Sequence, residues 1–155
     1  MQWAFTPRVI GQGAEAVVSS APISTTVTKV TTIPRAEMHI RNTVPGAVKA
    51  RYIGTQNGLR TYVQDKVHIL SKSQLSKAKT AIENIMKNKG WRKINHPNLQ
   101  GDAYTNGRYV VSDLGEGNVG VDWLGRIRFP DFAIESVPEF KLAMQKLGGI
   151  IFKIN

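Results

Sequence analysis

The stretch SKSQLSKAKTAIENIMKNKGW, residues 71–91, has the clearest helical pattern in the chain and decides its fold class. Ser71 and Gln74 have the spacing of a capping box, in which hydroxyl and amide satisfy free backbone N–H groups at a helix start. Gly90 suits the helix end, because glycine accepts a left-handed conformation without steric cost. The apolar side chains recur at helical spacing and form one stripe: Leu75, Ala78, Ile82, Ile85 and Met86.

Strand patterns lie on both sides of this helix. VKARYIGTQNGLRTYVQDKVHIL (48–70) predicts a hairpin that turns at Asn57-Gly58, since both residues tolerate positive φ. Alternation gives its second strand a mostly apolar face, with Val63, Val67 and Ile69, and a mostly polar face, with Tyr62, Gln64, Lys66 and His68. RYVVSD (108–113) predicts a further strand, and WRKINHPNLQGDAYTNG (91–107) a strand fragment followed by a loop.

The remaining segments complete an α+β pattern. NVGVDWLGRIRFPDFAI (118–134) predicts a second hairpin turning at Leu124-Gly125, SVPEFKLAMQKLGG (136–149) a short helix, and IIFKIN (150–155) a closing strand. We therefore expect an α+β fold: a central, mostly antiparallel sheet with two packed helices and an extended N-terminal arm.

The first 45 residues differ from the rest in composition. GAEAVVSSAPISTTVTKVTTIP (13–34) is rich in Ser, Thr, Val and Ala, and its two prolines argue against a continuous helix. The β-branched residues suit extended structure. The sequence thus predicts an extended arm or connector over residues 1–45 and a compact basic α+β domain over residues 46–155.

The charge distribution points to a polyanionic partner. The chain has a formal net charge of +10, and residues 46–101 hold eleven basic and two acidic groups. Residues 102–155 hold six basic and seven acidic groups. Cations hold phosphates, whereas carboxylate or imidazole groups move protons or bind a metal. A basic middle followed by a carboxylate-bearing end is therefore expected of a nuclease, although charge runs also occur on ordinary solvated faces.

Several classes of protein are disfavoured by composition. The chain has no cysteine and three histidines, which excludes disulfides and thiolate metal sites and makes a structural zinc site improbable. No apolar run approaches the ~18 residues that a membrane span needs. The N-terminus shows no signal-peptide pattern, and the chain contains no P-loop, GxSxG, GxGxxG or HExxH motif.

RIRFPDFAIESVPEFKLAM (126–144) resembles in outline the active-site signature of the PD-(D/E)xK metal-dependent nucleases. Pro130-Asp131 would supply the PD, and Glu139 and Lys141 the E-x-K. In that family the E-x-K lies on a strand, whereas Ser136 and Glu139 form a capping box that predicts a helix start. If Leu124-Gly125 is a two-residue turn, Asp122 and Asp131 also lie about 13 Å apart, too far to share a cation.

One feature keeps Asp131 among the candidates. The apolar register switches at Pro130-Asp131, with Ile127 and Phe129 on one face and Phe132 and Ile134 on the other. Such a switch predicts a bulge or bend, a feature often found beside active sites, or else a strand edge marked by proline.

His96 is the candidate proton-transfer group. It lies in INHPN (94–98), directly after the cationic run KNKGWRK, and imidazole can take a proton from an RNA 2′-hydroxyl without a metal. Alternatively, it is a loop residue before a proline. Arg108, Arg128 and Asp131 complete the predicted catalytic set, the arginines as phosphate clamps. The residues predicted to bind nucleic acid are Lys87, Lys89, Arg92, Lys93 and Arg126. Arg126 is also expected to be the cross-strand neighbour of Trp123, where stacking alone can explain it.

The connector-like GAEAVVSSAPISTTVTKV, the basic body 46–101 and the αβββαβ-like order of residues 73–155 together resemble the C-terminal nuclease toxin domains of bacterial contact-dependent inhibition and bacteriocin systems. No family motif is matched residue by residue. The resemblance implies a secreted or delivered effector that acts in the target-cell cytoplasm and is neutralised by an acidic immunity protein.

The leading hypothesis is a toxin-type ribonuclease, with tRNA as the favoured substrate and no cofactor. A metal-dependent DNase of the PD-(D/E)xK type, which requires a divalent metal, is the alternative enzyme. A non-catalytic nucleic-acid-binding module, which would bind without turnover, and an interaction domain for an acidic protein also remain open.

Overall fold

The computed structural model describes the chain except for residues 1–7, 13–15, 21–23, 97–98, 100 and 149–155. It separates into two compact units, an N-terminal unit (Met1–His68) and a C-terminal unit (Ile69–Asn155). The sequence placed a boundary at residue 45 instead. The difference arises because strands before and after residue 45 pair in one sheet.

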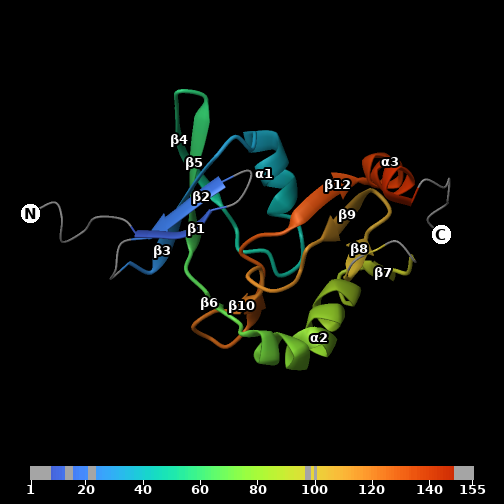
Figure 1. The fold of residues 1–155 in the computed structure, drawn as a ribbon. Coiled ribbons are helices and arrows are strands. Elements are labelled where there is room, and N and C mark those ends of the chain that lie inside the picture. Colours follow the sequence, from blue (N-terminus) through green and yellow to red (C-terminus); the bar gives the residue numbers. More distant parts are fainter. Residues whose placement is uncertain (1–7, 13–15, 21–23, 97–98, 100, 149–155) are drawn as a thin grey trace, which may run out of the picture. The chain divides into compact units, whose positions relative to one another are not determined.

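The N-terminal unit is built on a five-stranded antiparallel sheet (Figure 1). Its strands, in spatial order, are β1 (Arg8–Gln12), β2 (Ala16–Ser20), β3 (Thr26–Thr31), β5 (Leu59–Asp65) and β4 (Arg51–Gln56). The β4–β5 turn lies at Asn57-Gly58, with φ of 53° and 77°, as the sequence predicts. The segment read as an arm therefore contributes three strands to a sheet.

The predicted faces of β5 were wrong. Tyr62 and Gln64 are the buried residues of this strand, and Val63 is half-buried. The hydroxyl of Tyr62 donates to the carbonyl of Ile33 at 2.9 Å, and the amide of Gln64 donates to that of Val48 at 2.9 Å. Because both polar groups donate hydrogen bonds to buried carbonyls, the side chains of Tyr62 and Gln64 can be buried in the core with little desolvation penalty.

Helix α1 (Arg35–Arg41) was not predicted, because its seven residues are too few to show a periodic pattern. It buries Met38 and Arg41. Met38 packs with Ile33, Ala50 and Tyr62 in a hydrophobic cluster of the N-terminal unit.

The C-terminal unit contains helices α2 (Lys72–Lys87) and α3 (Val137–Gly148). Its four-stranded antiparallel sheet has the order β12 (Ala133–Ser136), β9 (Tyr109–Ser112), β8 (Ala103–Thr105) and β7 (Arg92–Ile94). A smaller sheet has the order β11 (Ile127–Arg128), β10 (Gly120–Val121) and β6 (His68–Ile69), the last lying at the boundary between the units. Across the described residues the fold is thus α+β, with three helices and three sheets in place of the single central sheet and two helices that the sequence predicted.

The prediction for α2 is confirmed. Ser71 and Gln74 form the capping box, and Ile82 and Met86 are the buried residues of the apolar stripe. At the other end Gly90 has φ of 84°, and the N–H groups of Gly90 and Trp91 donate to the carbonyls of Lys87 and Met86. This is the Schellman pattern, which turns the chain directly into β7.

The two helices cover opposite faces of the four-stranded sheet. Ile94, Ala103 and Val110, from three strands, pack with Phe140 and Met144 of α3. Tyr104 follows Ala103 in β8 and therefore points to the other face, where it lines a cavity with Leu75 and Ile82 of α2. The segment of β8 was predicted to be loop because the residues that flank it in the sequence are polar. Its three residues are all buried.

The register of the second hairpin differs by one residue from the prediction. Val121 pairs with Ile127, and the N–H of Asp122 donates to the carbonyl of Arg126 at 3.0 Å. The loop thus has three residues, Trp123 to Gly125, with Gly125 at φ of 78°. Arg126 is opposite Asp122 rather than Trp123, so the predicted Trp123–Arg126 cross-strand pair was wrong.

The apolar switch at Pro130-Asp131 marks a change of sheet. Phe129 is fully buried directly after β11, and Phe132 is buried directly before β12, which belongs to the four-stranded sheet. The E-x-K lies on α3, where the Ser136 hydroxyl accepts from the N–H of Glu139 at 3.3 Å, as expected for a helix start. The predicted closing strand, residues 150–155, lies outside the described residues.

Candidate functional site

Four cations gather where α2 ends and β7 begins. Lys87, Lys89, Arg92 and Lys93 are all exposed, and we call them the basic end of α2. Lys93 contacts a carboxylate, with its Nζ 3.4 Å from Oδ1 of Asp102. The other three form no ion pair with any residue that the structure describes. Their charges are therefore available to an external anion.

His96 lines an open cavity beside this basic end. The cavity has a volume of about 490 Å³, and its lining combines Lys93 and His96 with Ile94, Asn95, Leu99, Gly101 and Asp102. His96 is half-buried and has interactions within the protein. An imidazole, an ammonium and a carboxylate thus face the same space, which is a chemically competent set for proton transfer next to a phosphate.

A second cavity of about 310 Å³ adjoins the first, since Gly101 and Asp102 line both. Tyr104 belongs to its lining and is 2% exposed, yet its hydroxyl makes no hydrogen bond to any residue among those described. Burial, followed by the charges of Asp102 and Glu83, raises the pKa of Tyr104 to about 12. The hydroxyl therefore stays protonated and can donate to a group in the cavity.

Sequence reasoning missed Tyr104 as a candidate. Its segment AYT had been assigned to loop, and the signal that could have found it is a polar aromatic between two small residues of a buried strand. Asp113 also lines the second cavity, with a positive φ of 61° and its carbonyl accepting from the amide of Asn118 at 2.9 Å.

Arg126 and Arg128 lie at the β10–β11 turn and share one carboxylate. The Nε of Arg126 is 2.8 Å and that of Arg128 3.4 Å from Oδ2 of Asp122. Oδ1 of the same carboxylate accepts from the N–H groups of Leu124 and Arg126 at 3.0 and 2.9 Å. Burial pushes the pKa of Asp122 up, but these hydrogen bonds and the Arg126 charge outweigh it and hold the pKa below its ordinary value.

Of the four residues predicted to be catalytic, His96 alone lines either of the two cavities described above. Val119, directly before β10, accepts from the N–H of Leu70 at 2.9 Å and so fixes the hairpin of Arg128 at the start of α2. His96 lies two residues beyond β7, the strand that follows the other end of this helix. Figure 1 shows β10 near the start of α2 and β7 near its end, and a 16-residue helix is about 24 Å long.

Arg108 and Asp131 line neither cavity. Arg108 is exposed, with its guanidinium carbon 5.5 Å from the centre of the Tyr109 ring. Asp131 is also exposed, and its Oδ1 accepts from the N–H of Phe132 at 2.8 Å. Both remain predictions as catalytic residues, and neither shares one of these two cavities with His96.

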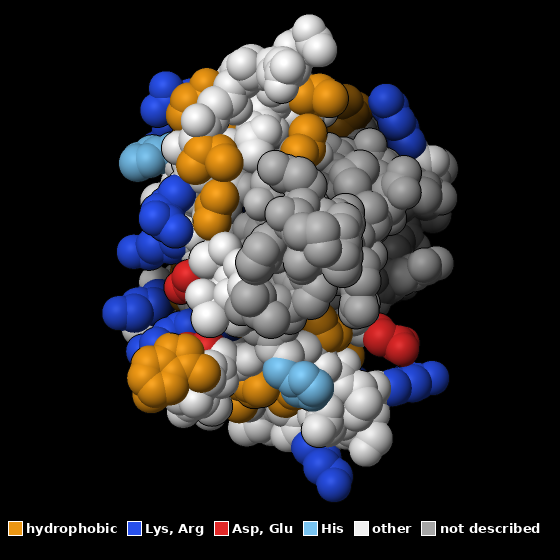
Figure 2. All heavy atoms as spheres, turned by 90° about the vertical axis from the view of Figure 1, so that its left-hand side faces the viewer, with side chains coloured by type: hydrophobic (Ala, Val, Ile, Leu, Met, Phe, Trp, Pro, Cys, Tyr) orange, Lys and Arg blue, Asp and Glu red, His pale blue; other side chains and the backbone are white. Residues whose placement is uncertain are grey.

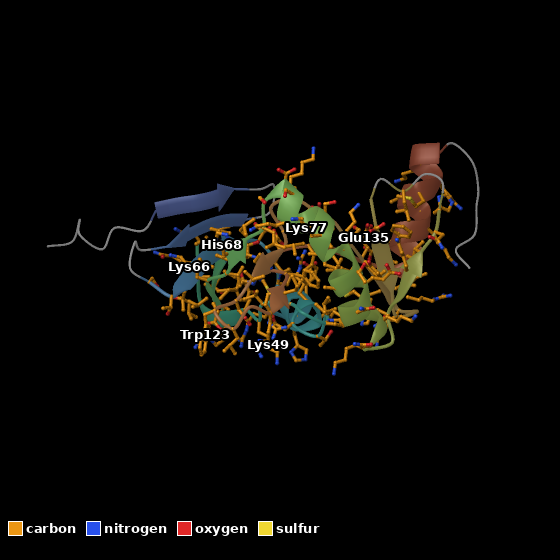
Figure 3. All side chains as sticks on the ribbon, turned by 90° about the horizontal axis from the view of Figure 1, so that it is seen from below. Lys49, Lys66, His68, Lys77, Trp123 and Glu135 are labelled. Atoms are coloured by element: carbon orange, nitrogen blue, oxygen red, sulfur yellow. The ribbon has the colours of Figure 1, made fainter. Side chains whose placement is uncertain are left out.

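Carboxylates of the C-terminal half meet at β12 and α3. Burial, followed by the charge of Glu139, raises the pKa of Glu135 above its ordinary value. Glu135 lies on the half-buried strand β12, and Figure 3 marks its position. Among the described residues, no three His, Cys, Asp or Glu side chains come close enough together to hold a metal ion.

The surface in Figure 2 shows more Lys and Arg than Asp and Glu side chains, in line with the net charge. No helix within the described part of the chain is long and apolar enough to cross a membrane. Comparison with known protein families, curated proteins and solved structures finds no match. Function must therefore be argued from the residues themselves.

Proposed function

We propose that this chain binds RNA at the basic end of α2 and cleaves it with His96, without a metal. The observation that carries the proposal is that His96 and Lys93 line one cavity beside three further exposed cations. Phosphate binding by Lys and Arg is electrostatic and independent of base sequence. The basic end supplies that attraction at the place where the proton-transfer group lies.

In this mechanism the imidazole of His96 takes the proton of a ribose 2′-hydroxyl. The 2′-oxygen attacks the adjacent phosphorus, the bond to the 5′-oxygen breaks, and a 2′,3′-cyclic phosphate forms. The leaving 5′-oxygen takes a proton from water, and the hydroxide that results takes the proton back from the His96 imidazolium. Lys93 offsets the negative charge that develops on the phosphate. The adjoining cavity, with the free hydroxyl of Tyr104, accommodates a base next to the cleaved phosphate.

The resemblance to toxin domains extends the proposal. It favours tRNA as the substrate, delivery into a target cell, and an acidic immunity protein that covers the same basic end. Charge complementarity supports such a partner, because the cations that bind phosphates also attract a carboxylate-rich surface.

A second candidate is a nucleic-acid-binding module without catalysis. It is favoured by the observation that, of the four predicted catalytic residues, His96 alone lines either of the two cavities. This candidate predicts retention of RNA without any cleavage.

The test is to express the chain without a partner protein and to resolve total RNA and plasmid DNA by electrophoresis after incubation, with and without EDTA. The proposal predicts cleavage of RNA, unchanged by EDTA and abolished by His96→Ala. Cleavage of DNA that EDTA prevents would replace it with the metal-dependent alternative. Intact RNA that co-elutes with the protein would support the binding module instead.

A further inference from the structure

The β10–β11 turn presents an indole to solvent. Trp123 is 89% exposed and Leu124 is 54% exposed, both within the three-residue loop (Figure 3). Trp91, by contrast, is 6% exposed. A tryptophan with almost all of its surface in water contributes little to folding, because it buries little apolar area.

The turn that carries Trp123 is held by one side chain. The Asp122 carboxylate accepts hydrogen bonds from the backbone N–H groups of Leu124 and Arg126 and from the Nε of Arg126. The backbone carbonyl of Asp122 accepts from the N–H of Gly125 at 2.9 Å. The Asp122 side chain is 12% exposed, and it makes these bonds at the protein surface. The backbone on which the indole stands is therefore ordered before any ligand binds, and docking loses less conformational entropy.

The surroundings of the indole are cationic. Arg126 is 57% exposed and Arg128 29% exposed, and the two arginines outnumber the one carboxylate that they share. An exposed aromatic ring beside arginines is the combination on which unpaired nucleobases stack, because every base has a π-face and its phosphate lies nearby.

We infer that Trp123 is a stacking platform for an unpaired base of a single-stranded nucleic acid, with Arg126 and Arg128 next to the flanking phosphate. The inference rests on the proposal that this chain binds nucleic acid, but it does not require cleavage. It places a second contact at the opposite end of α2 from His96. The substrate class that it names is single-stranded or looped RNA rather than duplex RNA.

The experiment measures binding of a short fluorescein-labelled 2′-O-methyl RNA by fluorescence anisotropy, since this RNA cannot be cleaved through its 2′-oxygen. Trp123→Ala should weaken binding of the single strand by about 5- to 150-fold, the equivalent of ~1–3 kcal/mol for one stacked base. Trp123→Phe should recover much of the loss. Leu124→Ala is the matched control on the same turn and should bind like the wild type.

Three further measurements distinguish stacking from other roles. The slope of log affinity against log salt should be unchanged in Trp123→Ala, because the indole carries no charge. Binding to a fully paired duplex of the same sequence should not depend on Trp123. Since the side chain is solvated, the variant should unfold at the wild-type temperature.

Equal affinity of Trp123→Ala and wild type for the single strand would overturn the inference and leave the proposed function standing. A wild type that binds no oligonucleotide would overturn both. Trp123-dependent sedimentation with phosphatidylserine vesicles, without any effect on RNA binding, would assign the exposed indole to a membrane surface instead.

Discussion

The two ends of helix α2 carry the same kinds of charged residue but use them differently. At the start of the helix, Arg126 and Arg128 share Asp122, which also holds the backbone of a tight turn. At the end of the helix, Lys87, Lys89 and Arg92 make no ion pair with any described residue. The comparison teaches that a count of cations does not locate a phosphate site; the carboxylates near them decide which cations are available.

The sharpest way to break the comparison is to remove the imidazole at the end of α2. His96→Ala should lower RNA cleavage by ~10²–10⁴-fold, the usual worth of a positioned proton-transfer group. Binding of RNA should survive, because the phosphate contacts come from the neighbouring cations.

His68→Ala is the control for this variant, since His68 is exposed on β6 and lines neither cavity. It should cleave like the wild type. Wild-type cleavage by His96→Ala would remove this residue from the mechanism, and equal losses in both variants would indicate a folding defect.

The start of α2 is tested by removing the shared carboxylate. Asp122→Ala leaves the N–H groups of Leu124 and Arg126 without their acceptor and two guanidinium groups without their counter-ion. We expect a lower free energy of unfolding, measured by urea titration, with RNA cleavage retained.

The pH dependence of this loss follows from the lowered pKa of Asp122. Stabilisation by a carboxylate whose folded pKa is depressed is present above the unfolded pKa of about 3.9 and is lost as the pH falls through the folded pKa. Wild type and Asp122→Ala should therefore differ in stability at neutral pH and converge in acid. A difference that persists unchanged below the folded pKa would contradict the role given to the carboxylate.

A smaller effect is expected at Glu135, which belongs to neither end of α2. Because the pKa of Glu135 is raised in the folded state, the native protein binds this proton more tightly than the unfolded chain does. The free energy of unfolding therefore falls as the pH rises from the ordinary carboxyl pKa through the raised folded pKa. Glu135→Gln should raise the melting temperature by a few degrees at neutral pH and change nothing well below the ordinary carboxyl pKa.

Glu139→Gln is the companion to Glu135→Gln, because the pKa of Glu135 is raised by burial and by the charge of Glu139. It relieves the same repulsion, and Gln also completes a capping box, so it should cost little stability and preserve activity. Loss of RNA cleavage in a folded Glu139→Gln protein would restore the metal-nuclease reading of the E-x-K.

Local patterns in the sequence predicted local structure well. The capping box of Ser71 and Gln74, the Asn57-Gly58 turn and the helix start at Ser136 were all confirmed, because each depends on residues within a few positions of one another. The sequence showed only that His96 follows the cationic run KNKGWRK; the structure adds that His96 and Lys93 line one cavity.

What the sequence did not reveal depends on partners distant in the chain. Tyr62 and Gln64 were assigned to a polar face because their buried acceptors, the carbonyls of Ile33 and Val48, lie far along the sequence. Asp122 is the exception, because its partners Leu124 and Arg126 are local; its role was missed because the side chain, rather than strand pairing, sets the loop length of the second hairpin. Tyr104 became a candidate only when the cavity beside α2 was seen.

The difference between the two ends of α2 is tested most directly by the salt dependence of RNA binding. Replacing Lys87, Lys89, Arg92 and Lys93 together with Gln should weaken binding and reduce the log–log slope for a single strand by about 2.1 to 2.8, because each phosphate contact contributes ~0.7 and Asp102 partly neutralises Lys93. Arg126→Gln with Arg128→Gln should change the slope by less, since Asp122 partly neutralises that pair. An unchanged slope in the fourfold variant, or a larger change in the arginine pair, would contradict the account.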